Sequence, residues 1–311
     1  MIIKERLYKI KENREKVNIS FGTFDALHRG HRKILLRLVK ESKKDKIKSV
    51  VFTFKNRPGH FLIKKENDII TPNEIRIKLF KELNIDILLF LNFNKSLAEL
   101  TPDRFISRLL DMFQINKIIV GEDFKFGKDK KGDVNYLKKI SKKYDFKILS
   151  LKKVKYRGEV ISSSRIRELI REGRIKVANI LLDREYSIEG TVEKGKGIGK
   201  RIGFPTANLK PLHKEQILPG CGVYLSKVNV DNKFYWGMTY IGHTKIKNKF
   251  VIETNIFNFR KEIYNKKIEI FFIKKLRNEF KIIKLDKLSA LLKEDKKKAI
   301  KLIKSMEVKK R

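Results

Sequence analysis

The sequence predicts an α/β domain with a parallel sheet, followed by a small antiparallel β-barrel and a C-terminal helix. Three observations lead to this fold class. In the first half, short β-branched runs alternate with helical patterns, as parallel strands joined by crossover helices require. From residue 186 onward, short strands follow one another with glycine turns and without intervening helices, which is typical of a β-barrel or a β-sandwich, and we predict the barrel. A lysine-rich amphipathic helix is then predicted over 287–306.

In the first half, the strands are predicted at 17–21, 48–54, 87–91 and 117–120. Two Thr-Pro pairs mark helix starts, at Thr71 and at Thr101, because threonine caps a helix and proline suits its first position. In the second half, the strands are predicted at 186–192, 222–228, 250–253 and 267–272. The pattern changes at residue 183, so we expect two domains, 1–183 and 184–311.

Length and composition allow two domains with cores, since 41% of the 311 residues are hydrophobic. The single cysteine, Cys221, excludes an internal disulfide framework and fits a reducing compartment. The N-terminus lacks the apolar segment of a signal peptide, and no run approaches the roughly 18 apolar residues that span a bilayer. We therefore expect a cytoplasmic protein without a membrane partner. We also expect it to be a monomer.

The formal net charge of +39 suggests a nucleic-acid partner, because basic surfaces bind phosphate backbones. However, lysines occur in every segment, on predicted helix faces such as Lys138 and at strand ends such as Lys266. No arginine-rich tail or nucleic-acid motif accompanies them. We interpret the charge as a solvated surface, with non-specific binding to RNA at low salt and no specific nucleic-acid partner.

Residues 17–31 run from a strand through a glycine turn into a helix. This arrangement brings backbone N–H groups and a helix N-terminus to one place, which suits an anion. His28 and His31 can each donate a hydrogen bond to phosphate, and Gly30 between them lets a phosphate chain approach the backbone. Two surface histidines near a helix start are the plainer interpretation.

Two further stretches of the first half can bind ligands. Gly121–Gly127 follows a predicted strand at its carboxyl end, where open α/β sheets bind ligands, and its aromatic residues can form a flat wall. An ordinary strand-end loop would have the same pattern. Residues 161–167 place three serines at a helix start, where they can cap the helix or bind phosphate, and Arg167 adds a planar fork of donors.

The informative stretch of the second half is the glycine-rich and basic segment 195–209. Its backbone amides can surround a phosphate chain, although the pattern is not a P-loop. Thr206 and Asn208 offer the hard oxygen ligands that Mg²⁺ prefers. A structural Gly/Pro loop would explain the same residues.

Together these motifs resemble, in order, those of the bacterial bifunctional riboflavin kinase/FAD synthetases: Gly-x-Phe-Asp-x-x-His-x-Gly-His, Ser-Ser-Ser-x-Ile-Arg and Gly-Phe-Pro-Thr-Ala-Asn. The resemblance implies a Rossmann-like nucleotidyltransferase domain and a riboflavin kinase-like barrel. For the first domain it implies an ATP site formed by Gly22, Phe24, Gly30, Ser162, Ser163, Ser164 and Arg167, with His28 and His31 as catalytic residues. It also implies flavin binding by Asp25, Asp123, Phe124 and Phe126.

For the barrel, the resemblance implies that Glu253 is the base that removes a proton from the ribityl hydroxyl of riboflavin. It implies Mg²⁺ at Thr206 and Asn208, and an ATP site formed by Gly195, Gly199, Lys200, Gly203 and Pro205. The chain departs from the family pattern at Ala26, at Asn255 in place of a histidine, and in the segment Tyr240–Thr244.

The predicted function is therefore FAD biosynthesis. ATP phosphorylates riboflavin to FMN, and a second ATP adenylylates FMN to FAD with release of pyrophosphate. Three alternatives stay open: an adenylyltransferase whose barrel binds flavin without phosphorylating it, a nucleotidyltransferase with another phosphate acceptor, and a basic nucleic-acid-binding protein.

Overall fold

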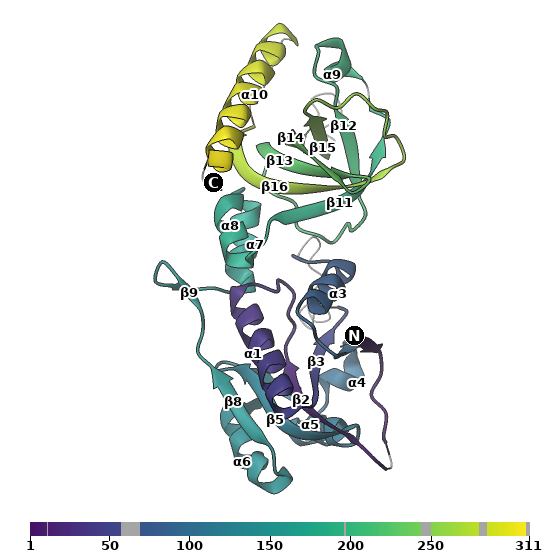
Figure 1. Ribbon diagram of the computed structural model, residues 1–311, viewed down its shortest axis with the longest axis vertical. Coiled ribbons are helices and arrows are strands. Elements are labelled where there is room, and N and C mark those ends of the chain that lie inside the picture. Colours follow the sequence, from purple (N-terminus) through teal and green to yellow (C-terminus); the bar gives the residue numbers. More distant parts are fainter. Residues whose placement is uncertain (11, 57–68, 196, 244–249, 280–284, 309–311) are drawn as a thin grey trace. The chain divides into compact units, whose positions relative to one another are not determined.

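The computed structural model describes residues 1–10, 12–56, 69–195, 197–243, 250–279 and 285–308 (Figure 1). The chain divides into two compact units, Met1–Ser163 and Ser164–Arg311. Helices α7 (Ser163–Arg171) and α8 (Ile175–Leu182) connect the sheet to the barrel along the chain. Helix α8 contacts the first and last strands of the barrel, so it packs with the second unit.

The first unit is built on a six-stranded sheet in which every neighbouring pair is parallel. Its order is β1 (Ile2–Lys4), β4 (Ile87–Leu91), β3 (Lys48–Phe54), β2 (Glu15–Phe21), β5 (Phe113–Gly121) and β8 (Lys147–Leu151). From β2 the chain first extends to one side through β3 and β4, then returns to the other side through β5. This reversal makes the carboxyl ends of β2 and β5 the switch point at which open α/β sheets bind ligands.

Helices cover both faces of this sheet. One core contains Leu109 and Leu137 from α5 and α6, and the other contains Leu35 and Phe80 from α1 and α3. The helices are α1 (Arg29–Asp45), α3 (Asn73–Glu82), α4 (Lys95–Ala98), α5 (Pro102–Leu110) and α6 (Val134–Tyr144). The remaining short elements are β6 (Lys125–Phe126), η1 (Lys128–Lys130), β7 (Gly132–Asp133), β9 (Lys155–Tyr156) and β10 (Glu159–Val160). The predicted parallel α/β architecture is confirmed.

One predicted helix cap is confirmed and the other is wrong. Thr101 caps α5, since its hydroxyl accepts a hydrogen bond from the backbone N–H of Arg104 at 3.3 Å. Thr71 is buried and lies one residue too early, because Pro72 itself has the extended ψ of 157° that marks the cap position. Helix α3 therefore begins at Asn73.

The second unit contains a closed antiparallel barrel, as predicted. Its strands, in order around the barrel, are β11 (Tyr186–Glu193), β12 (Ala207–Pro211), β15 (Phe250–Ile256), β14 (Lys233–His243), β13 (Gly222–Val230) and β16 (Lys267–Asn278). The short helix α9 (Ile198–Arg201) precedes β12, and the predicted C-terminal helix is α10 (Leu285–Val308). Among the described residues, no helix combines the length and apolar character needed to cross a membrane.

Helix α10 packs on the outside of the barrel against β14 and β16 (Figure 1). Val223, Leu225 and Met238 share a core with Ala299 and Ile303 of α10. Because alternate residues of a strand face opposite sides, Tyr240 lies on the same outer face of β14 as Met238. The face that carries α10 is therefore also the face that carries Tyr240 and Glu253, which lie opposite each other on β14 and β15.

A buried ion pair fixes α10 to the barrel. Nε of Arg277 on β16 donates to both carboxylate oxygens of Asp295, at 2.8 and 3.1 Å, and Asp295 is fully buried. Removing one member of such a pair leaves the other charge buried without a partner.

We expect Arg277→Met to lower the free energy of unfolding of the barrel unit by about 3–5 kcal/mol, measured in urea, because Asp295 stays buried. The matched control is Lys266→Met, which breaks the exposed pair of Lys266 with Asp231 in the same unit and should lower the free energy of unfolding far less. Equal losses in the two variants would contradict a stabilising role for the buried pair.

Candidate functional site

The turn after β2 is folded tightly over a buried aromatic ring. Gly22 follows the last residue of β2, and a Cβ atom there would lie 2.9 Å from the ring of Phe24. Phe24 has a positive φ of 44° and is 1% exposed, with its ring edge-on to those of His31 and Phe80. Phe24, predicted as an ATP-binding residue, thus supports the turn from the core side.

His28 and His31 lie together at the N-terminus of α1, as predicted. His28 is the N-cap, and its Nδ1 accepts a hydrogen bond from the backbone N–H of His31 at 3.3 Å. The two rings stack with centroids 3.7 Å apart. Because Nδ1 of His28 is an acceptor, a neutral His28 carries its proton on Nε2, where it is a donor. A Cβ atom on Gly30 would lie 3.0 Å from the His28 ring, so this glycine leaves room for the histidine.

Arg76, on α3, holds the turn in place and was not found by sequence analysis. Its guanidinium donates to the backbone oxygens of Thr23 and Phe54, at 2.6 and 2.7 Å, and to the hydroxyl of Thr53 at 2.7 Å. Burial lowers the pKa of Arg76 to about 10, opposed by the charge of Asp25, so it stays protonated at neutral pH. Its one sequence signal is that it shares a helix face with the buried Leu79 and Phe80.

The predicted aromatic wall lies at the carboxyl end of β5, next to β2 in the sheet. Phe124 is half-buried, with its ring parallel to that of Phe126 and 5.7 Å from that of Phe21. Phe126 is buried in the core, whereas Asp123 is exposed and pairs with Lys153 at 3.1 Å. Phe124 is therefore the ring of this set that remains accessible to a ligand.

Asp25 is buried rather than exposed at the turn. Its carboxylate accepts a hydrogen bond from the backbone N–H of Ile70 at 3.3 Å. This contact ties the turn after β2 to the segment that leads into α3.

The serine motif begins helix α7, as predicted. Ser162 and Ser163 are partly exposed, Ser164 is exposed and Arg167 is buried. The division between the two compact units falls between Ser163 and Ser164. That these residues and the two histidines act on one ATP molecule stays a prediction.

In the barrel, strand register brings the residues of the second candidate site together. Asn208 on β12 lies directly opposite Glu253 on β15, and Tyr240 on β14 lies opposite Glu253 from the other side. Thr206 lies two residues before Asn208, directly before the first residue of β12. Glu253 lies in the middle of β15 rather than at the strand end that the sequence predicted.

Burial raises the pKa of Glu253, because a half-buried carboxylate loses water that would stabilise its charge. Opposite it, the hydroxyl of Tyr240 donates to Oε1 of Glu279. That hydrogen bond is the largest cause of the lowered pKa of Glu279. Glu253 and Glu279, which both lie next to Tyr240, thus have pKa values shifted in opposite directions.

The glycines of segment 195–209 allow close packing of the loop on itself. A Cβ atom on Gly195 would overlap the amide of Asn208, and one on Gly199 would overlap the carbonyl oxygen of Phe204. Gly203 has a positive φ of 79°. Lys200 and Pro205 are exposed, so they can reach a ligand, while Phe204 is buried against the α10 core.

Asn255, a departure from the family pattern, fixes this loop. It is buried, and its Nδ2 donates to the carbonyl oxygen of Pro205 at 2.7 Å. The bond lies immediately before Thr206, the first of the two predicted Mg²⁺ ligands. Another departure, Tyr240–Thr244, is described only as far as His243, and Thr244 lies outside the described residues.

Two family models match the chain: FAD synthetase over residues 10–165 and riboflavin kinase over residues 182–303. Proteins named bifunctional riboflavin kinase/FMN adenylyltransferase are similar over most of their length. The protein of Buchnera aphidicola subsp. Schizaphis graminum is 35% identical to this chain, and the match covers 88% of this chain and 89% of the relative. The Bacillus subtilis protein is 33% identical, with 94% of each chain covered.

A solved structure of a Streptococcus pneumoniae protein, described as a macrolide-efflux protein, matches with a TM-score of 0.86 and 28% identity. It covers 96% of this chain and 98% of its own, so both halves of the fold recur there together.

The fold and the two groups of residues define a two-domain phosphate-transfer protein, with a nucleotidyltransferase-type sheet and a riboflavin kinase-type barrel. The chain belongs to the bifunctional riboflavin kinase/FMN adenylyltransferase family.

We expect Asn255→Ala to loosen the loop before β12, since the carbonyl of Pro205 loses its donor. Loss of a hydrogen bond worth about 1 kcal/mol should make amide hydrogen exchange roughly fivefold faster across residues 199–206. The matched control is Asn229→Ala on β13, outside this loop, which should leave that exchange unchanged. Unchanged exchange in Asn255→Ala itself would show that the bond does not order the loop.

Proposed function

We propose that this chain phosphorylates riboflavin to FMN and then adenylylates FMN to FAD. The observation that carries the proposal is the presence in one chain of two separate groups of residues suited to phosphate chemistry. One is the histidine pair at the switch point of the sheet, and the other is Glu253 opposite Asn208 in the barrel. We assign adenylylation to residues 1–183 and phosphorylation to residues 184–311.

In the adenylylation step, an oxygen of the FMN phosphate attacks the α-phosphorus of ATP, and pyrophosphate leaves. The attacking phosphate is already ionised at neutral pH, so the step requires no strong base. His28 and His31 stabilise the charge that develops on the phosphate oxygens, at the N-terminal end of α1. We assign ATP binding to Gly22, Phe24, Gly30, Ser162, Ser163, Ser164 and Arg167, with Phe24 acting by supporting the turn.

We assign the flavin of this step to the carboxyl ends of β2 and β5. Phe124 offers a half-buried ring beside the turn, and Phe126 stacks behind it. Asp123 lies exposed next to this ring, where it can accept a hydrogen bond from the flavin. Asp25 acts indirectly, through its bond to the backbone of Ile70.

In the phosphorylation step, the terminal ribityl hydroxyl of riboflavin attacks the γ-phosphorus of ATP, and ADP leaves. Glu253 takes the hydroxyl proton as the O–P bond forms, and its raised pKa makes it a stronger base than an exposed glutamate. Positioning supplies most of the remaining rate. The ATP contacts are assigned to Gly195, Gly199, Lys200, Gly203 and Pro205.

The donor set beside Glu253 fits Mg²⁺. Thr206 and Asn208 offer neutral hard oxygens two residues apart, and Asn208 lies opposite Glu253 in the strand pairing. When bound there, the ion would neutralise the charge of the ATP phosphates. Asn255 keeps Thr206 in position through the carbonyl of Pro205.

We further propose that the enzyme acts as a monomer in the cytoplasm, on small-molecule substrates. The high lysine content is spread over both units, which supports a solvated surface rather than a specific nucleic-acid site.

Matched variants separate the two reactions. We expect Glu253→Gln to lower FMN formation from riboflavin at least about 100-fold, because the base is lost, while FAD formation from FMN stays within twofold. Conversely, His31→Ala should lower FAD formation by about 100-fold and leave FMN formation intact. Product analysis with Mg²⁺-ATP and either riboflavin or FMN checks both.

In the same assay, the wild-type protein tests the whole assignment. FAD from both substrates is the expected result. FAD from FMN alone would refute kinase activity in the barrel and favour a single-activity adenylyltransferase. No flavin product from either substrate would refute the proposed chemistry altogether.

The pH dependence gives a separate prediction. Because Glu253 must be ionised to accept the proton, kcat/KM for riboflavin should fall as the pH drops through its raised pKa. We expect this acid limb above the ordinary glutamate value of about 4.3. FAD formation from FMN, measured on the same preparation, should lack that limb. An acid limb at or below the ordinary value would contradict the role of burial.

A further inference from the structure

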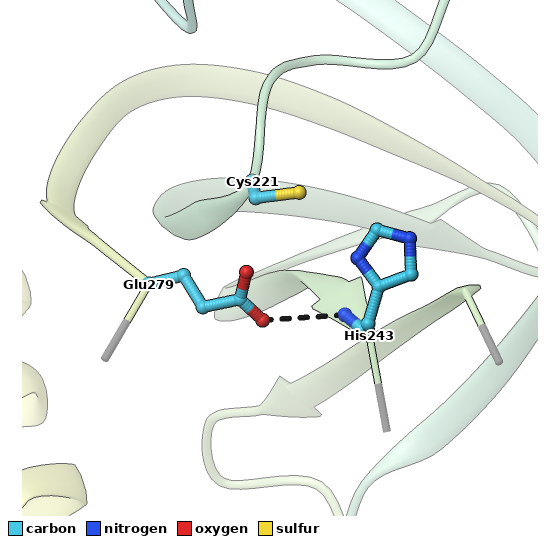
Figure 2. A group of neighbouring side chains, drawn as sticks. All are labelled: Cys221, His243 and Glu279. Carbon is cyan, nitrogen blue, oxygen red and sulfur yellow. Dashed lines mark hydrogen bonds between the residues drawn. The ribbon is translucent and has the colours of Figure 1, made fainter. Parts of the chain in front are cut away.

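Three side chains that can bind a metal ion gather at one end of the barrel, and none of them is assigned to phosphate transfer. They are Cys221, His243 and Glu279 (Figure 2). Their potential ligand atoms, a sulfur, an imidazole nitrogen and a carboxylate oxygen, all lie within 4.8 Å of one another. The three residues are far apart in the sequence, so the barrel brings them together.

Strand pairing explains how the group forms. Gly222 on β13 pairs with Ile241 on β14 and with Asn278 on β16. Cys221 directly precedes β13, His243 ends β14 and Glu279 directly follows β16, so the three residues lie at one end of three adjacent strands. Within this end, a Cβ atom on Gly242 would overlap the Glu279 carboxylate, so the glycine leaves room for that group.

The Glu279 carboxylate is held in a fixed orientation. Its Oε1 accepts hydrogen bonds from the backbone N–H of His243, at 3.2 Å, and from the hydroxyl of Tyr240. Figure 2 shows the second carboxylate oxygen on the side of the Cys221 sulfur. Hydrogen bonds of this kind to one oxygen orient the other for a metal ion and raise its affinity.

We propose that Cys221, His243 and Glu279 form a binding site for a divalent transition-metal ion of the Zn²⁺ class. A thiolate, an imidazole and a carboxylate are the donors that Zn²⁺ takes, with bonds of about 2.0–2.3 Å. Such bonds place tetrahedral ligands roughly 3.3–3.8 Å apart, and rotation of the exposed His243 ring closes the remaining gap. The fourth position is left for water.

The chemistry distinguishes this site from the proposed Mg²⁺ site. Mg²⁺ prefers hard oxygen ligands, such as those of Thr206 and Asn208, and binds thiolates poorly. The thiol of Cys221 interacts with Glu279 by a hydrogen bond, so an incoming ion replaces the thiol proton, which leaves to solvent. Cys221 is the one cysteine of the sequence, so any metal–thiolate signal reports this site alone.

The test is a titration of the untagged full-length protein with Co²⁺, which is coloured and occupies Zn²⁺ sites. We expect one equivalent of Co²⁺ to produce thiolate-to-metal charge-transfer absorption. Stoichiometric Zn²⁺ should abolish the absorption, and a large excess of Mg²⁺ should not. Absence of the charge-transfer absorption, or its loss on adding Mg²⁺, would overturn the proposal.

Variants assign the ligands. Cys221→Ser should abolish the charge-transfer absorption, His243→Ala should weaken Co²⁺ binding at least about tenfold, and Tyr240→Phe should weaken it about tenfold through loss of carboxylate orientation. The matched control is His213→Ala, which removes a histidine beside Glu215 and should change nothing. Because His243 is exposed at a strand end, His243→Ala tests the site even if Cys221→Ser does not fold. Wild-type affinity in His243→Ala would refute the site.

Discussion

Buried side-chain donors that point at backbone carbonyls hold the loops of both proposed sites. In the first unit, Arg76 donates to the carbonyls of Thr23 and Phe54, where β2 and β3 end. In the barrel, Asn255 donates to the carbonyl of Pro205, immediately before Thr206. Loops that bind phosphate must expose their amides, so they cannot satisfy all their carbonyls by regular pairing. A buried donor satisfies those carbonyls and leaves the amides available.

Burial also sets the pKa values of the charged groups beside these loops. It raises the pKa of Glu253, which suits a proton acceptor, and lowers that of Arg76 only to about 10, which keeps the cation charged. On the same face of the barrel, Tyr240 connects Glu253 to Glu279, since it lies opposite the first and donates to the second. The proposed base and the proposed metal site are therefore neighbours through one hydroxyl group.

Some motif residues have a different role in the structure from the one that the sequence pattern predicts. Gly30 is predicted to let a phosphate chain approach, and the structure gives it a second reason, because a side chain there would crowd the His28 ring. Likewise, Gly195 leaves room for the amide of Asn208. Phe24, grouped by motif with the ATP-binding residues, is a core residue that supports the turn. A motif therefore contains residues that position its ligand-binding members as well as those members themselves.

The sequence alone determined the alternation of strands and helices, the change to a barrel, the helix start at Thr101 and the order of the binding motifs. These features are local, since periodicity and caps are encoded within about ten consecutive residues. Only the tertiary structure decided that Arg76 lies under the turn after β2, that Asn255 holds Pro205, and that Glu253 lies opposite Asn208. It alone brought Cys221, His243 and Glu279 together. These contacts depend on strand order and register, which join residues distant along the chain and leave no periodic signal in the sequence.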